Sequence, residues 1–110
     1  MDTSRYREIL TRIRDYLLIY ADQKWSGRVD EWIHELNESS SPKSLRLHIE
    51  RSQKATSGMG SLGDLTICPQ NGHRIQNDRQ LISEASNGLW ALTSELYQES
   101  KALLTQLLDH

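Results

Sequence analysis

The sequence predicts a mainly α-helical single domain, a small bundle of about four helices with a long last helix and a short strand or β-hairpin inserted before it. Apolar residues recur at steps of three and four along most of the chain, which is the spacing of helices with one buried face. Four of the six glycines fall in one central stretch, Gly58–Ile75. A chain of 110 residues is sufficient for one modest core, so residues 1–110 are expected to form one domain.

Two helices are predicted in the first third of the chain. The segment Ser4–Lys24 carries the stripe of an amphipathic helix, and Ile19 lies among the residues that widen this stripe. Residues 25–27 (Trp-Ser-Gly) break the pattern. A second, short helix is therefore predicted over Val29–Leu36, with Ser26 as its N-cap.

A third helix is predicted over Pro42–Lys54, because Ser41 followed by proline is typical of a cap and a first helical residue. One face of this helix is only weakly apolar and contains His48, Ile49 and Ser52. We expect His48 to be half-buried with its hydrogen bonds satisfied.

The last helix is predicted to start after Asn77, with Gln80 completing an asparagine version of the capping box. Its apolar seam runs from Leu81 to Leu107, about 45 Å if the helix is continuous at 1.5 Å per residue. Residues 86–88 (Ser-Asn-Gly) are the one place where a bend is expected.

The central stretch predicts a shaped loop followed by a short strand or hairpin at Leu65–Ile75. Closely spaced glycines allow backbone conformations that other residues avoid, and an Asn-Gly pair is typical of a tight turn. Asp64 or Ser61 could fix the turn through hydrogen bonds to backbone amides. The residues expected to build this loop are Gly58, Gly60, Ser61, Asp64, Asn71, Gly72 and His73.

The segment Gly-Met-Gly-Ser-Leu-Gly-Asp-Leu, followed by Ile-Cys and Asn-Gly-His, resembles the signature of a family of small bacterial proteins of unassigned biochemistry. That signature is approximately Gly-Gly-Met-Gly-Ser-(Leu/Phe)-Asn-Asp-Leu, and this chain has Ser57 and Gly63 where the pattern has Gly and Asn. The resemblance covers Gly58 to about Tyr97. It implies a compact helical domain and a role as an immunity or antagonist protein of a secreted bacterial toxin, and it implies no catalytic activity.

Catalysis and metal binding are weakly supported by the residue pattern. Cys68 or Ser61 could be a nucleophile with His73 as base and Asp64 orienting it, but no oxyanion-hole motif accompanies them. An isolated cysteine in an apolar segment usually behaves as a small hydrophobic residue. The paired cysteine spacing of a structural zinc site is absent. We therefore expect no enzyme activity, no cofactor and no metal.

Composition and charge restrict the class of partner. The formal net charge is −2, which argues against nucleic acid, and no apolar run approaches the length of a membrane span. A single cysteine and an N-terminus without an apolar core fit a cytoplasmic protein. Residues 58–110 carry three basic and six acidic residues, so this half could face a basic protein partner.

The leading hypothesis is a protein-binding antagonist, an immunity protein that neutralises a cognate toxin by occlusion. The acids expected to contact the partner are Asp64, Asp78, Glu84, Glu95 and Glu99. One alternative is a small ligand-binding protein or enzyme that uses the Gly58–Ile75 loop. A second alternative is a helical oligomer, because the seam of the last helix is long for a chain of this size.

Overall fold

Four α-helices make up most of the chain in a computed structural model that describes residues 2–39, 41–56, 62 and 65–108. The helices are α1 (Ser4–Tyr20), α2 (Gln23–Glu38), α3 (Pro42–Thr56) and α4 (Arg79–Leu108). A 3-10 turn, η2 (Pro69–Asn71), lies between α3 and α4. The mainly helical prediction is therefore confirmed.

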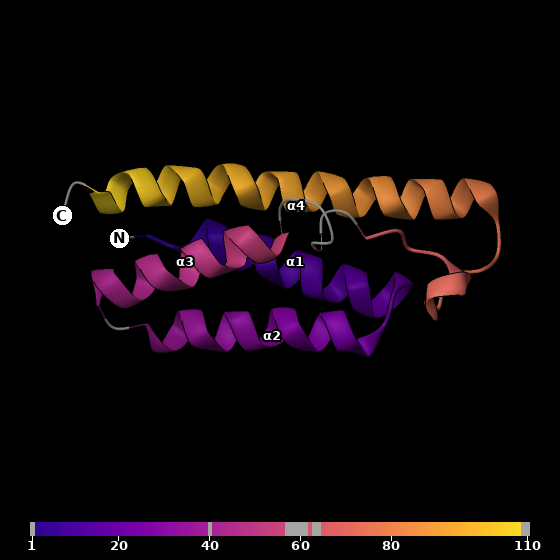
Figure 1. Cartoon of the computed structure of the whole chain (residues 1–110), viewed down its shortest axis with the longest axis horizontal. Coiled ribbons are helices and arrows are strands. Elements are labelled where there is room, and N and C mark those ends of the chain that lie inside the picture. The colour runs from indigo at the N-terminus through magenta and orange to yellow at the C-terminus, as the bar shows by residue number, and fades with distance from the viewer. Residues whose placement is uncertain (1, 40, 57–61, 63–64, 109–110) are drawn as a thin grey trace.

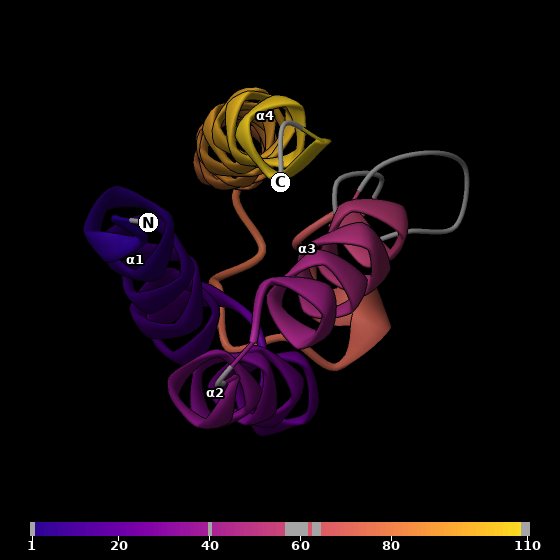
Figure 2. The same ribbon diagram turned by 90° about the vertical axis from the view of Figure 1, so that its left-hand side faces the viewer.

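The helices run alternately up and down along an elongated molecule of about 49 × 21 × 21 Å (Figure 1). Viewed end-on, they occupy four corners, and α1 and α3 each lie between α2 and α4 (Figure 2). This is the arrangement of an antiparallel four-helix bundle. No helix in the described ranges combines the length and the apolar character needed to cross a lipid bilayer.

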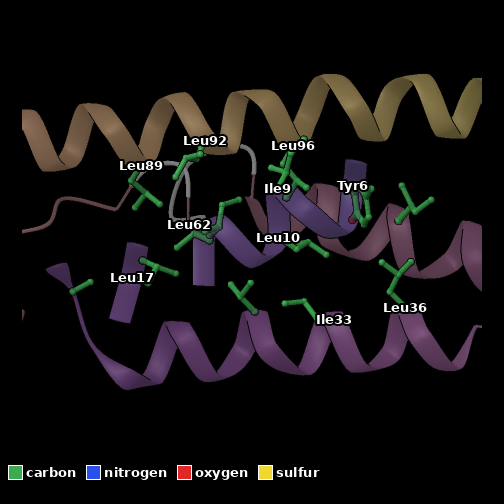
Figure 3. Packing of buried hydrophobic residues seen from close by; sticks show 14 of the residues in the cluster. Tyr6, Ile9, Leu10, Leu17, Ile33, Leu36, Leu62, Leu89, Leu92 and Leu96 are labelled. Carbon is green, nitrogen blue, oxygen red and sulfur yellow. The ribbon is translucent and has the colours of Figure 1, made fainter. Parts of the chain in front are cut away.

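The core is a continuous column of apolar side chains between the four helices. Figure 3 shows residues from α1, α2 and α4 converging on it, together with Leu62, which precedes α4 in the sequence. The predicted seam of α4 is buried as far as Leu107. Leu103 and Leu107, which motivated the oligomer hypothesis, are thus covered within one chain. Only Leu81, at the start of the seam, is exposed.

The helix boundaries differ from the predicted ones where an unexpected residue provides the cap. Asp22, and not Ser26, caps α2 by accepting a hydrogen bond from the amide of Trp25 at 3.0 Å. Ser26 is buried inside the helix. Ser41 caps α3 as predicted, through the amide of Ser44 at 3.1 Å.

The start of α4 is also shifted. The carboxylate of Asp78 accepts from the amide of Leu81 at 3.1 Å, so Asp78 caps α4 in place of the predicted Asn77. Asp78 gives a stronger cap here because its charge also faces the positive end of the helix dipole.

The predicted strand or hairpin at Leu65–Ile75 was wrong, since the described residues contain no strand. The backbone is extended at Cys68 but then enters η2, and Gly72 closes the turn with φ 77°. Two backbone amides of this segment donate to residues outside it instead. The amide of Ile67 donates to the hydroxyl of Ser86 at 3.0 Å, and that of Arg74 to the carbonyl of Ala21 at 3.0 Å.

The helix α4 continues through residues 86–88, because the glycine there serves a contact and not a bend. The hydroxyl of Tyr16 donates to the carbonyl of Ala85 at 2.8 Å. A Cβ atom added at Gly88 would lie 2.3 Å from this hydroxyl and 3.0 Å from the adjoining ring carbon. Gly88 therefore allows α1 to approach α4 at this level.

We expect Gly88→Ala to gain helix propensity, about 1 kcal/mol, and to lose a similar amount by displacing the Tyr16 hydroxyl. In a Tyr16→Phe background the hydroxyl is gone and the ring carbon at 3.0 Å remains, so the same substitution should be more favourable than in the wild-type chain, by about 0.5–1 kcal/mol in the free energy of unfolding. Urea unfolding of the wild-type chain, Gly88→Ala, Tyr16→Phe and the double variant measures how far the effect of each substitution depends on the other. Gly27→Ala is the matched control, because Gly27 lies in α2 with nothing within 4 Å of an added Cβ, and it should stabilise in either background. Additive effects of the Tyr16 and Gly88 substitutions would contradict the contact.

Candidate functional site

Two polar residues of the central stretch, His73 and Asn71, are bonded to the backbone of the stretch itself. Nδ1 of His73 accepts a hydrogen bond from the amide of Cys68 at 3.1 Å. The side-chain amide of Asn71 donates to the carbonyl of Thr66 at 2.8 Å. Gly72 completes the turn through its own amide, which donates to the carbonyl of Pro69. Together these bonds close the turn around η2.

This turn is fastened to the junction between α1 and α2. The guanidinium of Arg74 donates to the carbonyl of Leu18 at 3.1 Å, and its backbone amide donates to the carbonyl of Ala21. These two carbonyls lie at the C-terminal end of α1, where helices leave acceptors without intrahelical partners. Nε2 of His73 lies 3.6 Å from the carboxylate of Asp22, the residue that caps α2. We call this set of contacts, centred on His73 and Arg74, the clasp.

The clasp bears directly on the enzyme and ligand alternative, which requires the loop side chains to converge on open space. His73 is buried, with one ring nitrogen bonded to a backbone amide and the other near the carboxylate of Asp22, and Asn71 is bonded to a backbone carbonyl. Among the described residues no group of three or more His, Cys, Asp or Glu side chains could hold a metal ion. The predicted loop residues Gly58, Gly60, Ser61 and Asp64 lie outside the described residues.

We expect His73→Leu to lower the free energy of unfolding by about 1–3 kcal/mol, because it leaves the amide of Cys68 without its acceptor. His73→Asn should recover part of this loss, since its side-chain oxygen can stand near the position of Nδ1. Thermal and urea unfolding measure the stability of both His73 variants. His34→Leu is the control, because His34 is 73% exposed and its substitution should change stability by no more than about 0.5 kcal/mol. Equal stability of the two His73 variants would contradict the assigned hydrogen bond.

The acids predicted to contact a partner have different positions in the fold. Asp78 is the cap of α4, and Asp64 lies outside the described residues. The remaining three, Glu84, Glu95 and Glu99, project from one face of α4, because their spacing of eleven and four residues returns to the same side of the helix. The structure therefore brings three of the five together.

That face of α4 borders α1, and three adjoining, open hollows of about 320, 490 and 450 Å³ lie beside it. The third lies mainly over the outer side of α4, with Arg5 as its lining residue from α1. The first and second hollows share Tyr16 and Ile19, and the second and third share Ala91 and Glu95. We call this continuous depression the α1–α4 furrow. It extends from Leu81, at one end of α4, to Glu99.

Exposed apolar side chains gather along the α1–α4 furrow. Seven large apolar residues of the described chain are exposed, and four of them line it. These four are Ile19, Tyr20, Leu81 and Trp90. Trp90 is 64% exposed and Ile19 is 63% exposed. A tryptophan this accessible is unusual in an isolated domain, whereas it is common at surfaces that bind proteins.

Ion pairs connect α1 and α4 along the furrow. Arg12 lies 3.1 Å from Glu95, and Arg5 lies 3.8 Å from Glu99. Both pairs are largely exposed, so each contributes little to stability and is screened by salt. Glu84 differs, because its carboxylate accepts from the side-chain amide of Gln80 at 3.1 Å and from no cation among the described residues.

The furrow was only partly foreseeable from the sequence. The stripe of the first helix is widened at Ile19, and this signal indicated an additional contact surface. Nothing in the sequence indicated that Ile19 and Leu81 line one hollow, because they are 62 positions apart and come together only in the folded chain.

A second polar feature lies between α2 and α3, on the other side of the core. His48 is 5% exposed, and its Nδ1 lies 3.4 Å from the carboxylate of Glu35. Its Nε2 is buried without a hydrogen-bond partner in the described structure. The prediction of a half-buried, satisfied His48 was therefore wrong on both counts. The neighbouring Tyr6 ring packs edge-on at 6.2 Å, and its hydroxyl is bonded to that of Ser52.

Burial determines how these groups titrate. It raises the pKa of Tyr6 to about 12, and the hydrogen bond to Ser52 opposes this shift. Burial also lowers the pKa of His48, against the opposing attraction of Glu35. The neutral imidazole is therefore the form that the fold accommodates.

We expect acid to destabilise the protein through His48. Its pKa is lower in the folded state than in the unfolded state, where it is about 6.5, so the unfolded chain binds the proton more readily. The stability contributed by neutral His48 is fully present above about pH 6.5 and is lost as the pH falls through the folded pKa. The free energy of unfolding, measured in urea between about pH 5.5 and 7.5, should increase with pH, and His48→Gln should reduce this slope. His34→Gln should leave the slope unchanged, and an unaltered slope in the His48 variant would contradict this assignment.

Comparison of the chain with protein-family models, with curated proteins and with solved structures gave no match.

Proposed function

We propose that this chain is a protein-binding module and that the α1–α4 furrow is its binding surface. The observation that carries the proposal is the exposed Trp90, which stands beside Ala91 and Ser94 in one of the three hollows. Tryptophan is over-represented among the residues that dominate binding energy at protein interfaces. A partner that covers Trp90 and Ile19 would remove two large apolar side chains from water.

The shape of the furrow favours a macromolecular partner. Sites for small molecules are usually concave pockets that enclose most of the ligand. The furrow is instead a series of three connected hollows along the length of two helices. An elongated, partly apolar surface bordered by charged residues is typical of protein interfaces.

We propose further that binding serves to antagonise the partner, by occlusion, in the manner of a bacterial immunity protein that acts in the cytoplasm on a cognate toxin. Support comes from the resemblance of the central stretch and from the acids Glu84, Glu95 and Glu99 along the furrow. Glu84, which has no cation beside it among the described residues, suits a basic partner, and a toxin that acts on a polyanionic substrate would be basic. We propose no catalytic role, because Nδ1 of His73, the candidate base, is occupied by the backbone amide of Cys68.

We expect Trp90→Lys to abolish partner capture without unfolding the protein, because an exposed side chain on a helix can be exchanged with little effect on stability. The measurement is affinity capture from the lysate and secretome of the native host, followed by mass spectrometry and reconstitution of the complex. Leu47→Lys is the matched control, since Leu47 is a 46% exposed apolar residue of α3 that does not line the furrow.

Two further measurements decide the antagonist role. The isolated partner should lose its activity when the wild-type chain is added at equimolar ratio, and should keep it with Trp90→Lys. A partner retained by Trp90→Lys but lost with Leu47→Lys would contradict the proposed surface. A partner that stays fully active in the complex would contradict antagonism and leave binding intact.

A further inference from the structure

We infer that the pair Asn71–Gly72 is a site of spontaneous deamidation, and that the turn around η2 controls its reaction. The chain contains the same pair a second time, as Asn87–Gly88. Both asparagines are exposed to solvent, so the backbone around each pair decides which of them reacts. The inference does not depend on the proposed function.

The reaction needs only the chain and water. The backbone nitrogen of the glycine loses its proton to solvent and bonds to Cγ of the preceding asparagine. The bond from Cγ to Nδ2 then breaks, and Nδ2 leaves as ammonia after taking up a proton from water. Water opens the resulting succinimide ring, at Cγ to give isoaspartate's isomer aspartate, or at the backbone carbonyl to give isoaspartate. Glycine favours ring closure because it has no Cβ to obstruct the approach.

In the folded chain, the turn around η2 keeps the reacting groups of Asn71–Gly72 apart. The amide of Gly72 donates to the carbonyl of Pro69 at 2.9 Å, so the proton that must leave is bonded. Nδ2 of Asn71, the leaving group, donates to the carbonyl of Thr66 at 2.8 Å. Asn71 also belongs to a 3-10 turn, and this helical backbone directs the following nitrogen away from its Cγ. Ring closure therefore requires the turn to open.

The turn can open without disturbing the helices of the core. No residue of η2 is buried, and the turn is closed by a few hydrogen bonds within residues 66–73. A segment with few buried apolar contacts opens locally at a smaller free-energy cost than global unfolding. Asn71 therefore reacts through a minor open state of the folded chain.

The second pair has no such local route. Asn87 and Gly88 lie in the interior of α4, between Ala85 and Leu89, which are both buried in the core. Releasing this backbone from the helix would withdraw both core side chains and break the hydrogen bond from Tyr16 to the carbonyl of Ala85. Because a helix interior opens cooperatively with its neighbours, we expect Asn87 to react only through global unfolding.

Deamidation also weakens the turn that controls it. A carboxylate at position 71 has no proton to donate to the carbonyl of Thr66, and two acceptors then face each other. Isoaspartate lengthens the main chain between Cys68 and His73, whose hydrogen bond closes the turn. The products therefore hold the turn less tightly than asparagine does, and refolding does not reverse the change.

The test follows the folded chain at mildly alkaline pH and measures conversion at each pair over time by peptide mass spectrometry. Asn71 should convert at least about tenfold faster than Asn87. It should convert more slowly than the same asparagine in a synthetic peptide of residues 66–76, which lacks the clasp. Urea below the unfolding transition should accelerate conversion at Asn87 more than at Asn71, because global unfolding exposes more surface than local opening.

Two variants separate local opening from global unfolding. His73→Leu removes the acceptor of the Cys68 amide and should speed conversion at Asn71 by at least about fivefold. Ile9→Val weakens the buried core and leaves the clasp intact, so it should not change this rate. Circular dichroism confirms that each variant is folded, and the comparison of Asn71 with Asn87 within the wild-type chain needs no variant.

The effect of the product on the turn is measured with Asn71→Asp, which should lower the melting temperature. Asn87→Asp is the matched control, because asparagine and aspartate have similar helix propensities and Asn87 is exposed on α4. Equal rates at Asn71 and Asn87, a rate at Asn71 equal to that in the peptide, or equal acceleration by His73→Leu and Ile9→Val would overturn the inference. Equal melting temperatures of the two aspartate variants would overturn the weakening of the turn.

Discussion

The long apolar seam of α4 is the constraint to which the rest of the molecule conforms. This helix has 30 residues, whereas α1, α2 and α3 have 17, 16 and 15. A seam of about 45 Å cannot be covered by one helix of half its length, so each side of α4 needs more than one element. On one side, α3 ends at Thr56, and the buried side chains of Leu62 (Figure 3) and Ile67 continue the coverage toward the start of α4.

The central stretch is therefore part of the core, and its form follows from that position. Leu62 and Ile67 are completely buried, while the polar residues after them hold the segment against the helix ends. An extended segment buried among helices has no neighbouring strand to satisfy its amides. Side chains such as Ser86 and His73 take that role, and this explains why polar residues are concentrated in the segment.

The helices could be predicted from the sequence because each depends on periodicity within its own segment. The strand could not, because Thr66-Ile67-Cys68 has the local composition of a strand, and only the folded chain shows that its partners are helices. The cap of α2 was missed because two residues could cap it, and tertiary packing buries Ser26 and leaves Asp22 at the junction. The shared face of Glu84, Glu95 and Glu99 follows from helical spacing, but their position beside α1 depends on the packing of two distant segments.

Arg74 belongs both to the clasp and to the lining of the α1–α4 furrow. Its guanidinium donates to the carbonyl of Leu18 near the end of α1, so the same side chain stabilises the junction and lines the proposed binding surface. Under the proposed function, occupancy of the furrow and closure of the junction would be linked equilibria. A partner that leaves Arg74 in place protects the α1–α2 junction from local opening, and by reciprocity any change that loosens this junction weakens the partner's affinity by the same factor.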